Sequence, residues 1–578
     1  MSNPESSPLS RRHWLGLVST ASVGSGLLAA ATGAPAAEPP AADPGSLGTR
    51  IYNIRDFGAR GDGQTLDTAA LQSAIDACHR DQGGTVLVPA GVFVIGTVEL
   101  KSNVTLHLAA QGKLLGTADG RQYHAANDVP LSGDSTLGDG NTGLIFAVKA
   151  ENITIEGAGT IDGQGAQFRS AVRGEPPPSG IGGAHRPYHL MLYQCQNVVV
   201  RGLRLVNGAF HSLRIVQCRY ARFDGIHIHN RVNHNNDGFH FISCDYVHVV
   251  NCDVQCQDDA CALFGSCKFV TITNSSFSTR WSVFRFGGGI AENITVSNCL
   301  IYETFGCPIK MRCGPDSRFE NISFSNLVMT NVTGPISIGV GRQRRRGGGG
   351  AGGGGSTTNS LQLAEMPESA KPGIVRNISF SGIHAVVAKP TQFADVGFIS
   401  GYNPGEMFSA IILNGTGEGV LENISFDDVH VTFPGGGTAE QGAVRDVPRV
   451  AGEYYEIGVP PAYGMYARNV QGLTLQNVRF QVAAPDLRPA VIFDHVQDAL
   501  VNGMSVQGDR KAESVMRFIG ARDVLLAATR VLGQGSAFLQ VEGADSSGIK
   551  IDGGDLSKAT APLAFKAGAA QSAVKWRE

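Results

Sequence analysis

Three aspartates lie a short, fixed distance apart near the middle of the chain. Asp237 follows two asparagines, and the adjacent pair Asp258 and Asp259 begins 21 residues later. Cleavage of a glycosidic bond needs one carboxyl group to protonate the leaving oxygen and a second to activate water or attack the anomeric carbon. Carboxylates held close together also raise at least one pKa toward the value that a general acid needs. The spacing indicates acid–base chemistry if the fold gathers these residues; the alternative is three ordinary acidic residues in turns.

A repeated segment supplies the frame that could gather them. Each unit alternates apolar and polar residues and closes on Asn, Gly or Asp, which is the pattern of a short strand followed by a turn. From residue 197 to residue 321 the steps between units are 23, 26, 23, 24 and 28 residues. The units begin at Asn152, Asn197, Tyr220, Tyr246, Phe269, Asn293, Asn321, Asn377 and Asn423. Stacked coils bury a continuous inner column that one strand could not bury alone, so the period predicts an all-β, single-stranded, right-handed parallel β-helix.

A helix signal precedes the repeats. Asp67 and Thr68 form an N-cap for an amphipathic helix that runs to about Arg80. A stack of repeats needs a closed end, so we expect an N-terminal capping helix.

The β-helix has a consequence for the paired aspartates. Consecutive strand residues point to opposite sides. Asp258 and Asp259 can therefore face the same side only if the chain bends there, and we predict a turn or bulge at the pair.

The repeat also accounts for two motifs that resemble separate sites. Cys195, Cys218, Cys244 and Cys267 recur at nearly the same place in four successive units, which predicts an interior ladder of buried thiols and not a metal site. Five Asn-Ile-Ser/Thr triplets are potential glycosylation sequons, but their fixed phase predicts asparagine side chains that bond the turn backbone. One or two disulfides remain open among five further cysteines: Cys252, Cys256, Cys299, Cys307 and Cys313.

The N-terminus has the features of an export signal. Two arginines at positions 11 and 12 precede a small apolar run, and Ala34-Pro35-Ala36 offers a cleavage site. Residues 1–40 are therefore expected to be a twin-arginine signal peptide and a Pro/Ala-rich linker, which would deliver the protein to the periplasm or the exterior without a membrane span in the mature chain. Residues 41–578 would form the β-helix domain, with a flexible insertion of four arginines and eight glycines at 342–358.

The overall charge excludes a general attraction to polyanions. The chain has 47 basic and 50 acidic residues and a formal net charge of −3. We therefore expect neither nucleic acid nor an anionic membrane as a partner, and any affinity for an anionic substrate must come from a local patch.

These motifs together resemble glycoside hydrolase family 28, the polygalacturonase family, with its pectin-lyase-like solenoid. The likeness spans roughly residues 50–340 and rests on Asn235-x-Asp237-Gly238, the Asp258-Asp259 pair about one coil later, the Asp-Phe-Gly-Ala-x-Gly-Asp-Gly stretch at 56–63 and the strand run at 98–108. The resemblance implies an enzyme that inverts the anomeric centre. It implies that Asp258 is the general acid, that Asp237 and Asp259 hold and activate the water, and that Asn235 contacts the substrate.

Two motifs of the family are altered. The Gly-His-Gly expected about one coil after the aspartate pair is replaced by Thr279-Arg280-Trp281, and Arg-Ile-Lys is replaced by Pro308-Ile309-Lys310. His234 and His240, with His211 near the same face, are the neighbours that could stand in for the absent histidine. Each could equally be a turn or packing residue.

A group of basic residues follows the acids by one and two coils. It comprises Arg280, Arg285, Lys310 and Arg312. These side chains could hold a uronate carboxylate, the arginines through a bidentate fork, although each alone could be an ordinary solvent-facing charge. Trp281 could stack on a sugar or pack within the protein.

The sequence therefore predicts a monomeric inverting glycosidase without metal or cofactor. Its expected substrate is an acidic, galacturonate-containing polysaccharide or oligosaccharide, such as homogalacturonan or a rhamnogalacturonan fragment. One alternative is a polysaccharide lyase on the same fold, with Ca²⁺-binding carboxylates and Arg285 or Lys310 as the base. The other is a carbohydrate-binding solenoid whose catalysis has decayed, since a fold alone does not establish function.

Overall fold

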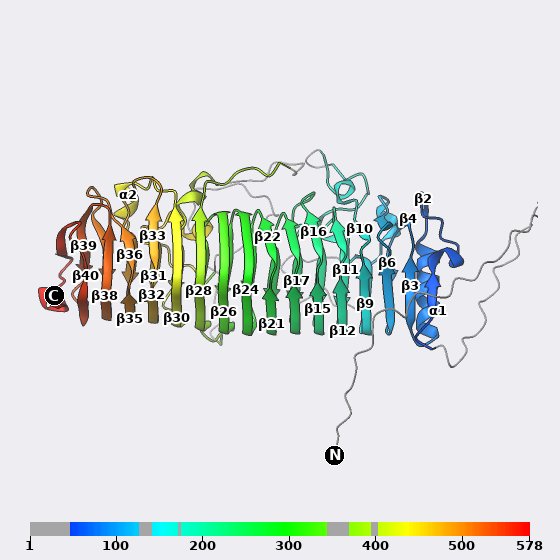
Figure 1. The fold of residues 1–578 in the computed structure, drawn as a ribbon, viewed down its shortest axis with the longest axis horizontal. Coiled ribbons are helices and arrows are strands. Elements are labelled where there is room, and N and C mark those ends of the chain that lie inside the picture. The colour runs from blue at the N-terminus through cyan, green and yellow to red at the C-terminus, as the bar shows by residue number, and fades with distance from the viewer. Residues whose placement is uncertain (1–46, 127–140, 172–174, 344–368, 395–402, 578) are drawn as a thin grey trace, which may run out of the picture. The chain divides into compact units, whose positions relative to one another are not determined.

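The computed structural model describes residues 47–126, 141–171, 175–343, 369–394 and 403–577. The predicted signal segment and residues 344–358 of the predicted insertion lie outside these ranges. Within the unit Asp43–Glu578 the chain winds into successive coils, and the colours of Figure 1 follow the coils in chain order from β1 (Ile51–Asn53) to β42 (Val574–Arg577).

Three short strands form each coil. One coil consists of β14 (Leu213–Val216), β15 (Arg219–Asp224) and β16 (His227–Asn230), and the next of β17 (Phe239–Ile242), β18 (Asp245–Val250) and β19 (Asp253–Cys256). Each strand pairs in parallel with the strand one coil away, as β14 pairs with β17 and β15 with β18. The predicted all-β, right-handed parallel β-helix is confirmed.

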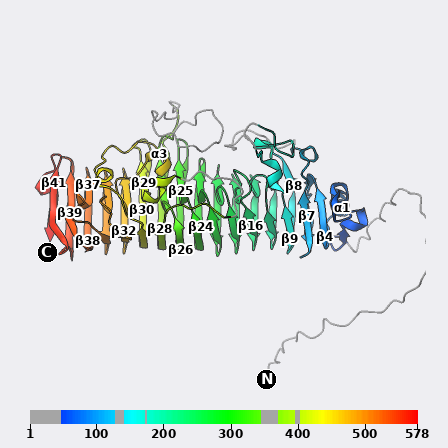
Figure 2. The ribbon, with the colours of Figure 1, turned by 90° about the horizontal axis from the view of Figure 1, so that it is seen from above.

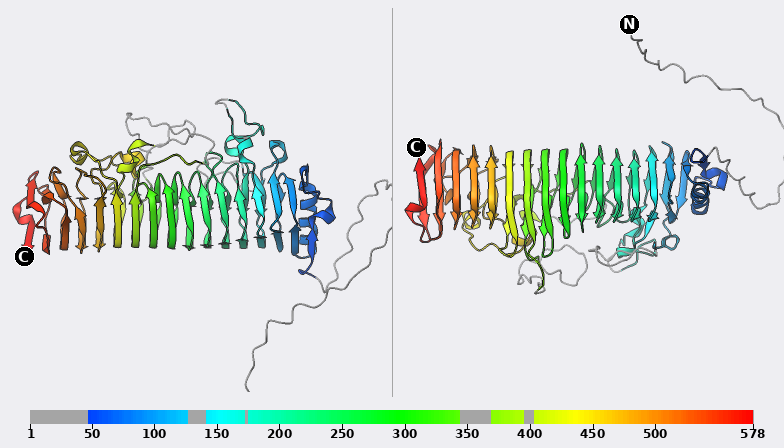
Figure 3. Two further views of the ribbon diagram at one scale, coloured as in Figure 1. Left: turned by 45° about the horizontal axis from the view of Figure 1, so that its top comes forward. Right: turned by 90° about the horizontal axis from the view of Figure 1, so that it is seen from below.

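One face of the described part of the helix is a 15-stranded parallel sheet that runs from β5 (Val98–Glu99) to β41 (Ala559–Lys566). Figures 2 and 3 show the same orderly stacking from three further sides. The sheet includes β20 (Cys261–Phe264), β23 (Ser282–Gly287) and β25 (Cys307–Cys313), which follow β17 in that order.

Alternate residues of this sheet point inward and outward. The inward positions form a buried column, in register from coil to coil: Ile215, Phe241, Leu263, Phe286 and Met311. Each such side chain contributes about 1.5–3 kcal/mol through removal of its apolar surface from water. The outward positions one residue before them form a second row: Arg214, His240, Ala262, Arg285 and Lys310. The apolar column therefore fixes which polar side chains lie side by side on the outer face.

The turns that open the second strand of each coil hold a ladder of asparagines. Asn377 has φ 55°, and its Nδ2 donates to Asn321 Oδ1 (3.0 Å) while its Oδ1 accepts from Asn423 Nδ2 (3.2 Å). The expectation that these side chains bond turn backbone is wrong: they bond the equivalent asparagine of the next coil. Asparagine suits this position because it tolerates the left-handed region better than most residues. In three successive coils Tyr220, Tyr246 and Phe269 replace it and stack with ring centroids 4.9 Å apart.

All eleven cysteines are buried and free. Cys195, Cys218, Cys244 and Cys267 form the predicted interior ladder, and the Cys195 backbone N–H donates to Cys218 Sγ (3.3 Å). None of the five cysteines considered for disulfides is paired.

Helix α1 (Thr68–Arg80) begins and ends where the sequence predicts and packs on β1, β3 (Gly84–Val88), β5 and β6 (Val104–Leu108). Asp67 occupies the N-cap position, but its side chain does not cap the helix. Its carboxylate instead accepts hydrogen bonds from the backbone N–H groups of Arg60 (2.8 Å) and Gly61 (3.0 Å). None of the helices in the described residues combines the length and the apolar character that a membrane span requires.

The asparagine ladder leads to a stability prediction. Asn377→Ala removes the ladder bonds and also places a Cβ-bearing residue of low αL preference at φ 55°, whereas Asn377→Gly removes only the bonds. We expect Ala to destabilise the protein by about 1 kcal/mol more than Gly. Denaturant unfolding of both variants measures the difference, and equal stabilities would show that backbone conformation does not select asparagine here.

Candidate active site

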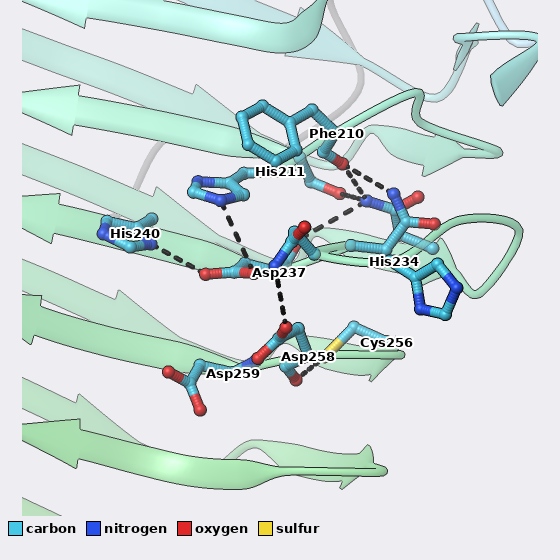
Figure 4. Close-up of polar contacts among 12 residues, drawn as sticks. Phe210, His211, His234, Asp237, His240, Cys256, Asp258 and Asp259 are labelled. Atoms are coloured by element: carbon cyan, nitrogen blue, oxygen red, sulfur yellow. Dashed lines mark hydrogen bonds and ion pairs between the residues drawn. The ribbon is translucent and has the colours of Figure 1, made fainter. Parts of the chain in front are cut away.

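The three aspartates lie at one edge of the 15-stranded sheet, on adjacent coils. Asp237 precedes β17 by two residues, and Asp258 and Asp259 precede β20. Because β17 and β20 pair in register, with Phe239 opposite Cys261, the residues before them also lie side by side. Figure 4 shows the three aspartate side chains gathered in this region.

Backbone contacts between the two coils hold this edge together. The chain bends at residues 257 and 258, as predicted for the aspartate pair, and the N–H groups of Gln257 and Asp258 both donate to Asn236 O (3.1 Å each). Gly238 N donates to Asp259 O (3.0 Å). A Cβ at Gly238 would lie 2.5 Å from Ala260 O, so the glycine after Asp237 allows the coils to approach.

Asp258 has the environment of a general acid. Its Oδ2 accepts from Asn235 Nδ2 (3.3 Å), and its Oδ1 accepts from the Asp259 backbone N–H (2.9 Å). Burial and the charge of Asp259 raise the pKa of Asp258 to about 7. The carboxyl group can therefore carry a proton near neutral pH, as proton donation to a leaving group requires.

Asp259 is partly exposed beside it. Its Oδ1 accepts from the backbone N–H of Ser282 (3.3 Å), the first residue of β23. This bond ties the carboxylate to the following coil and leaves Oδ2 with no hydrogen bond among the described residues.

Asp237 is buried and paired with a histidine. His240 Nδ1 lies 2.7 Å from Asp237 Oδ2, and His211 Nε2 lies 3.6 Å from Asp237 Oδ1. Burial and the charges of Asp258 and Asp259 raise the pKa of Asp237, while burial and the nearby Arg214 lower the pKa of His240. The short contact lets the pair share one proton, so that it remains neutral whichever partner carries the proton.

The loop before Asp237 is fixed by polar residues that sequence reasoning did not single out. Asn236 Nδ2 donates to the carbonyls of Gly208 (3.0 Å) and Phe210 (2.8 Å), and its Oδ1 accepts from Asn233 N (2.6 Å). The buried Arg186 donates to His234 O (2.5 Å) and Asn235 Oδ1 (3.1 Å). Arg186 comes from the segment before β11 (Tyr188–Tyr193), outside the repeat pattern, and nothing in its spacing identified it.

The histidine candidates differ in whether they contact the aspartates. His240 lies on β17 in contact with Asp237, whereas His234 is exposed and its ring points away from the carboxylates in Figure 4. The His211 ring stacks on His240, with centroids 4.5 Å apart and planes 12° apart. Of the two histidines expected to replace the family residue, only His240 contacts an acid.

Among the described residues one group could hold a metal ion. The ligand atoms of His211, Asp237 and His240 lie within 4.8 Å of one another. The two imidazole rings of this group also stack on each other, with centroids 4.5 Å apart and planes 12° apart.

The basic residues lie on the expected coils, but most are already paired. Arg280 forms an ion pair with Glu406 (3.2 Å), and each side chain is only 1% exposed. Lys310 pairs with Glu453 (2.6 Å), and Arg312 pairs with Glu453 (2.5 Å) and with Glu456. The glutamates come from η6 (Pro404–Phe408) and from α3 (Tyr454–Ile457) with the residue before it. No signal in the repeat identified them, because both segments are insertions between coils.

Arg285 and Trp281 have different surroundings from these three ion-paired residues. Arg285 Nη1 donates to Phe286 O (2.6 Å), and the guanidinium lies over the Phe264 ring at 5.6 Å. Among the described residues it forms no ion pair with a carboxylate. Trp281 is partly exposed and lies 5.2 Å from the Tyr455 ring, so at least part of the indole is used in packing.

The raised pKa of Asp258 leads to a second stability prediction. A carboxyl group whose pKa is raised on folding ionises in the unfolded chain at lower pH than in the folded protein, so its stability penalty builds up from about pH 4 and is complete above about pH 7. Asp258→Asn removes this titration, and we expect a higher melting temperature than wild type at pH 8 with little gain at pH 4. An equal gain at both pH values in thermal unfolding would show that Asp258 is not the group with the raised pKa.

Comparison with known proteins agrees with the motifs. Residues 78–348 match the family model of glycosyl hydrolases family 28. A probable polygalacturonase of Vitis vinifera is 33% identical over 36% of this chain and 43% of its own length. An exo-poly-alpha-D-galacturonosidase of Dickeya chrysanthemi is 40% identical over 20% of each chain. The chain thus spans less than half the length of either relative.

A solved structure supports the fold independently. The family 28 exopolygalacturonase of Yersinia enterocolitica superposes with a TM-score of 0.53 over 78% of each chain, at 18% identity. The expected resemblance is therefore confirmed: through residues 78–348 this chain is related to glycosyl hydrolases family 28.

Proposed function

We propose that the protein is an inverting glycoside hydrolase that cleaves a galacturonate-containing polysaccharide or oligosaccharide. The observation that carries the proposal is Asp258, whose pKa is raised to about 7 beside two further carboxylates at one sheet edge. One protonated and one ionised carboxyl group near the same bond are what glycoside hydrolysis needs.

In the proposed reaction Asp258 transfers its proton to the glycosidic oxygen as the bond to the anomeric carbon breaks. Water attacks that carbon from the opposite face, and its proton passes to Asp259 or Asp237. Asp237 can accept a proton only when His240 carries the one they share. Asn235 supports the acid by donating to Asp258 Oδ2.

The substrate class is supported by the relatives, which are described as a probable polygalacturonase and an exo-poly-alpha-D-galacturonosidase. The arginine pair and apolar run before residue 40 support export by the twin-arginine route, and we propose a monomer as the working form.

A product assay tests the reaction class. The protein is incubated with polygalacturonic acid or rhamnogalacturonan fragments, with and without a chelator. We expect new reducing ends, no ultraviolet absorbance from an unsaturated product and no effect of the chelator. Unsaturated product that disappears with chelator would identify a lyase, and no product on a broad glycan panel would favour a binding protein.

Loss of the acid should remove turnover without unfolding the protein. We expect Asp258→Asn to lower kcat by about 10²–10⁴-fold, the usual contribution of a general acid. Asp253→Asn is a matched control, because Asp253 lies on β19 of the same turn and pairs with His227 away from the acids. Wild-type turnover in Asp258→Asn would contradict the assignment.

The pH profile should show the same group. Because Asp258 acts in its protonated form and has a pKa of about 7, kcat should decline about tenfold per pH unit above that value. Initial rates on one substrate from pH 4 to 9 measure the decline, and a rate that holds up to pH 9 would exclude Asp258 as the essential acid.

A further inference from the structure

Three glutamates from segments outside the repeat form ion pairs with basic residues beside the aspartates. Glu406 lies in the segment between β28 (Ile374–Val387) and β29 (Ile411–Gly415), while Glu453 and Glu456 lie between β30 (Val420–Phe433) and β31 (Met465–Arg468). All three reach residues more than a hundred positions earlier in the chain, as the contacts of Arg280 with Glu406 and of Arg312 with Glu453 show.

These ion pairs are too enclosed to open at little cost. Glu453 is 4% exposed and contacts two cations, Lys310 (2.6 Å) and Arg312 (2.5 Å). Its pKa is held well below the ordinary value by these two cations, against the opposing effect of burial. A substrate carboxylate that took either cation would leave a buried glutamate uncompensated, which is strongly unfavourable.

Most of the basic residues on this side of the acids therefore already have a partner. Arg280 pairs with Glu406, and Lys310 and Arg312 pair with Glu453 and Glu456. Arg285 has no ion pair among the described residues, but its guanidinium donates to the Phe286 carbonyl and lies over the ring of Phe264, a residue of β20. The two cations of β25 and Arg280 are thus not available to an anionic sugar.

Aromatic surface lies at the same place. Trp281 and Tyr455 are partly exposed, and the Lys310 ammonium lies 5.7 Å and 5.8 Å from their ring centroids. Apolar rings with few free donors suit the face and hydroxyl groups of a sugar better than a carboxylate.

We propose that Glu406, Glu453 and Glu456 determine the charge specificity of this site: they withdraw Arg280, Lys310 and Arg312 from the substrate, so that the glycosyl unit over β25 binds uncharged. The unit is a neutral sugar or a uronate whose carboxyl group is esterified. This inference rests on the proposed function, because it concerns the substrate of the same acids.

Two ligands that differ in the charge of their carboxyl groups test it. Trigalacturonate and its methyl ester have the same sugars and linkages. We measure kcat/KM for both with the wild-type protein, and binding of both to Asp258→Asn by calorimetry. The methyl ester should be preferred by at least about tenfold, the scale of one charge-assisted contact.

Variants of the glutamates should shift the preference. Glu453→Gln frees Lys310 and leaves Arg312 to Glu456, so we expect the preference to move about tenfold toward the free acid. Glu456→Gln removes only one partner of Arg312, and we expect it to shift the preference in the same direction by a smaller factor. This variant takes the place of Glu453→Gln in the test if Glu453→Gln does not fold. Glu418→Gln is the matched control, because Glu418 pairs with Arg342 in a partly exposed contact, and it should leave the preference unchanged.

The outcomes separate the two proposals. Tighter binding and faster cleavage of the free acid by wild type, or variants that leave the preference unmoved, would overturn the inference while the hydrolase remains. Absence of hydrolysis on every glycan would overturn the proposed function, whereas the calorimetric preference of Asp258→Asn would still decide the inference. Binding of neither ligand would overturn it.

Discussion

Parallel hydrogen bonding between successive coils is the constraint on which the site depends. It keeps neighbouring strands about 4.7–4.9 Å apart and in register, as His240 with Ala262 and Arg285 with Lys310 show. A slip of one residue would turn the inward phenylalanines outward and the outward charges into the core. The apolar column inside the helix therefore holds the acids on its edge in place.

The same constraint places like charges side by side at the edge of the sheet, where ionised carboxylates repel each other. Two different solutions are found within one coil of each other. Asp237 is buried 2.7 Å from His240, with which it can share a proton, while burial and the charge of Asp259 raise the pKa of Asp258. An isolated carboxylate on such a sheet would remain ionised and could not donate a proton near neutral pH. The burial and crowding that cost stability are thus also what raises the pKa of the acid.

Much of this arrangement could be predicted from the sequence because the repeat converts spacing into position. The 21 residues between Asp237 and Asp258 correspond to one coil, and the adjacency of Asp258 and Asp259 implied the bend that the structure has. Details that depend on competing partners could not be predicted. Asp67 lies at the start of the helix, yet its carboxylate accepts hydrogen bonds from the backbone N–H groups of Arg60 and Gly61. The asparagines of the turns bond each other across coils and not the backbone beside them.

The glutamates that pair with the basic residues could not be predicted from the sequence either. They show that the repeat and the insertions determine different features of the site. Lys310 and Arg312 lie where coil spacing predicts, since the repeat determines their register. Their partners Glu453 and Glu456 lie in an insertion, where no period relates a residue to its neighbours in space. The repeat thus specifies the acids and the cations, while insertions between coils decide whether those cations remain available. A change in one insertion can alter the charge of the accepted sugar without moving a catalytic carboxylate, because the two are held by different parts of the chain.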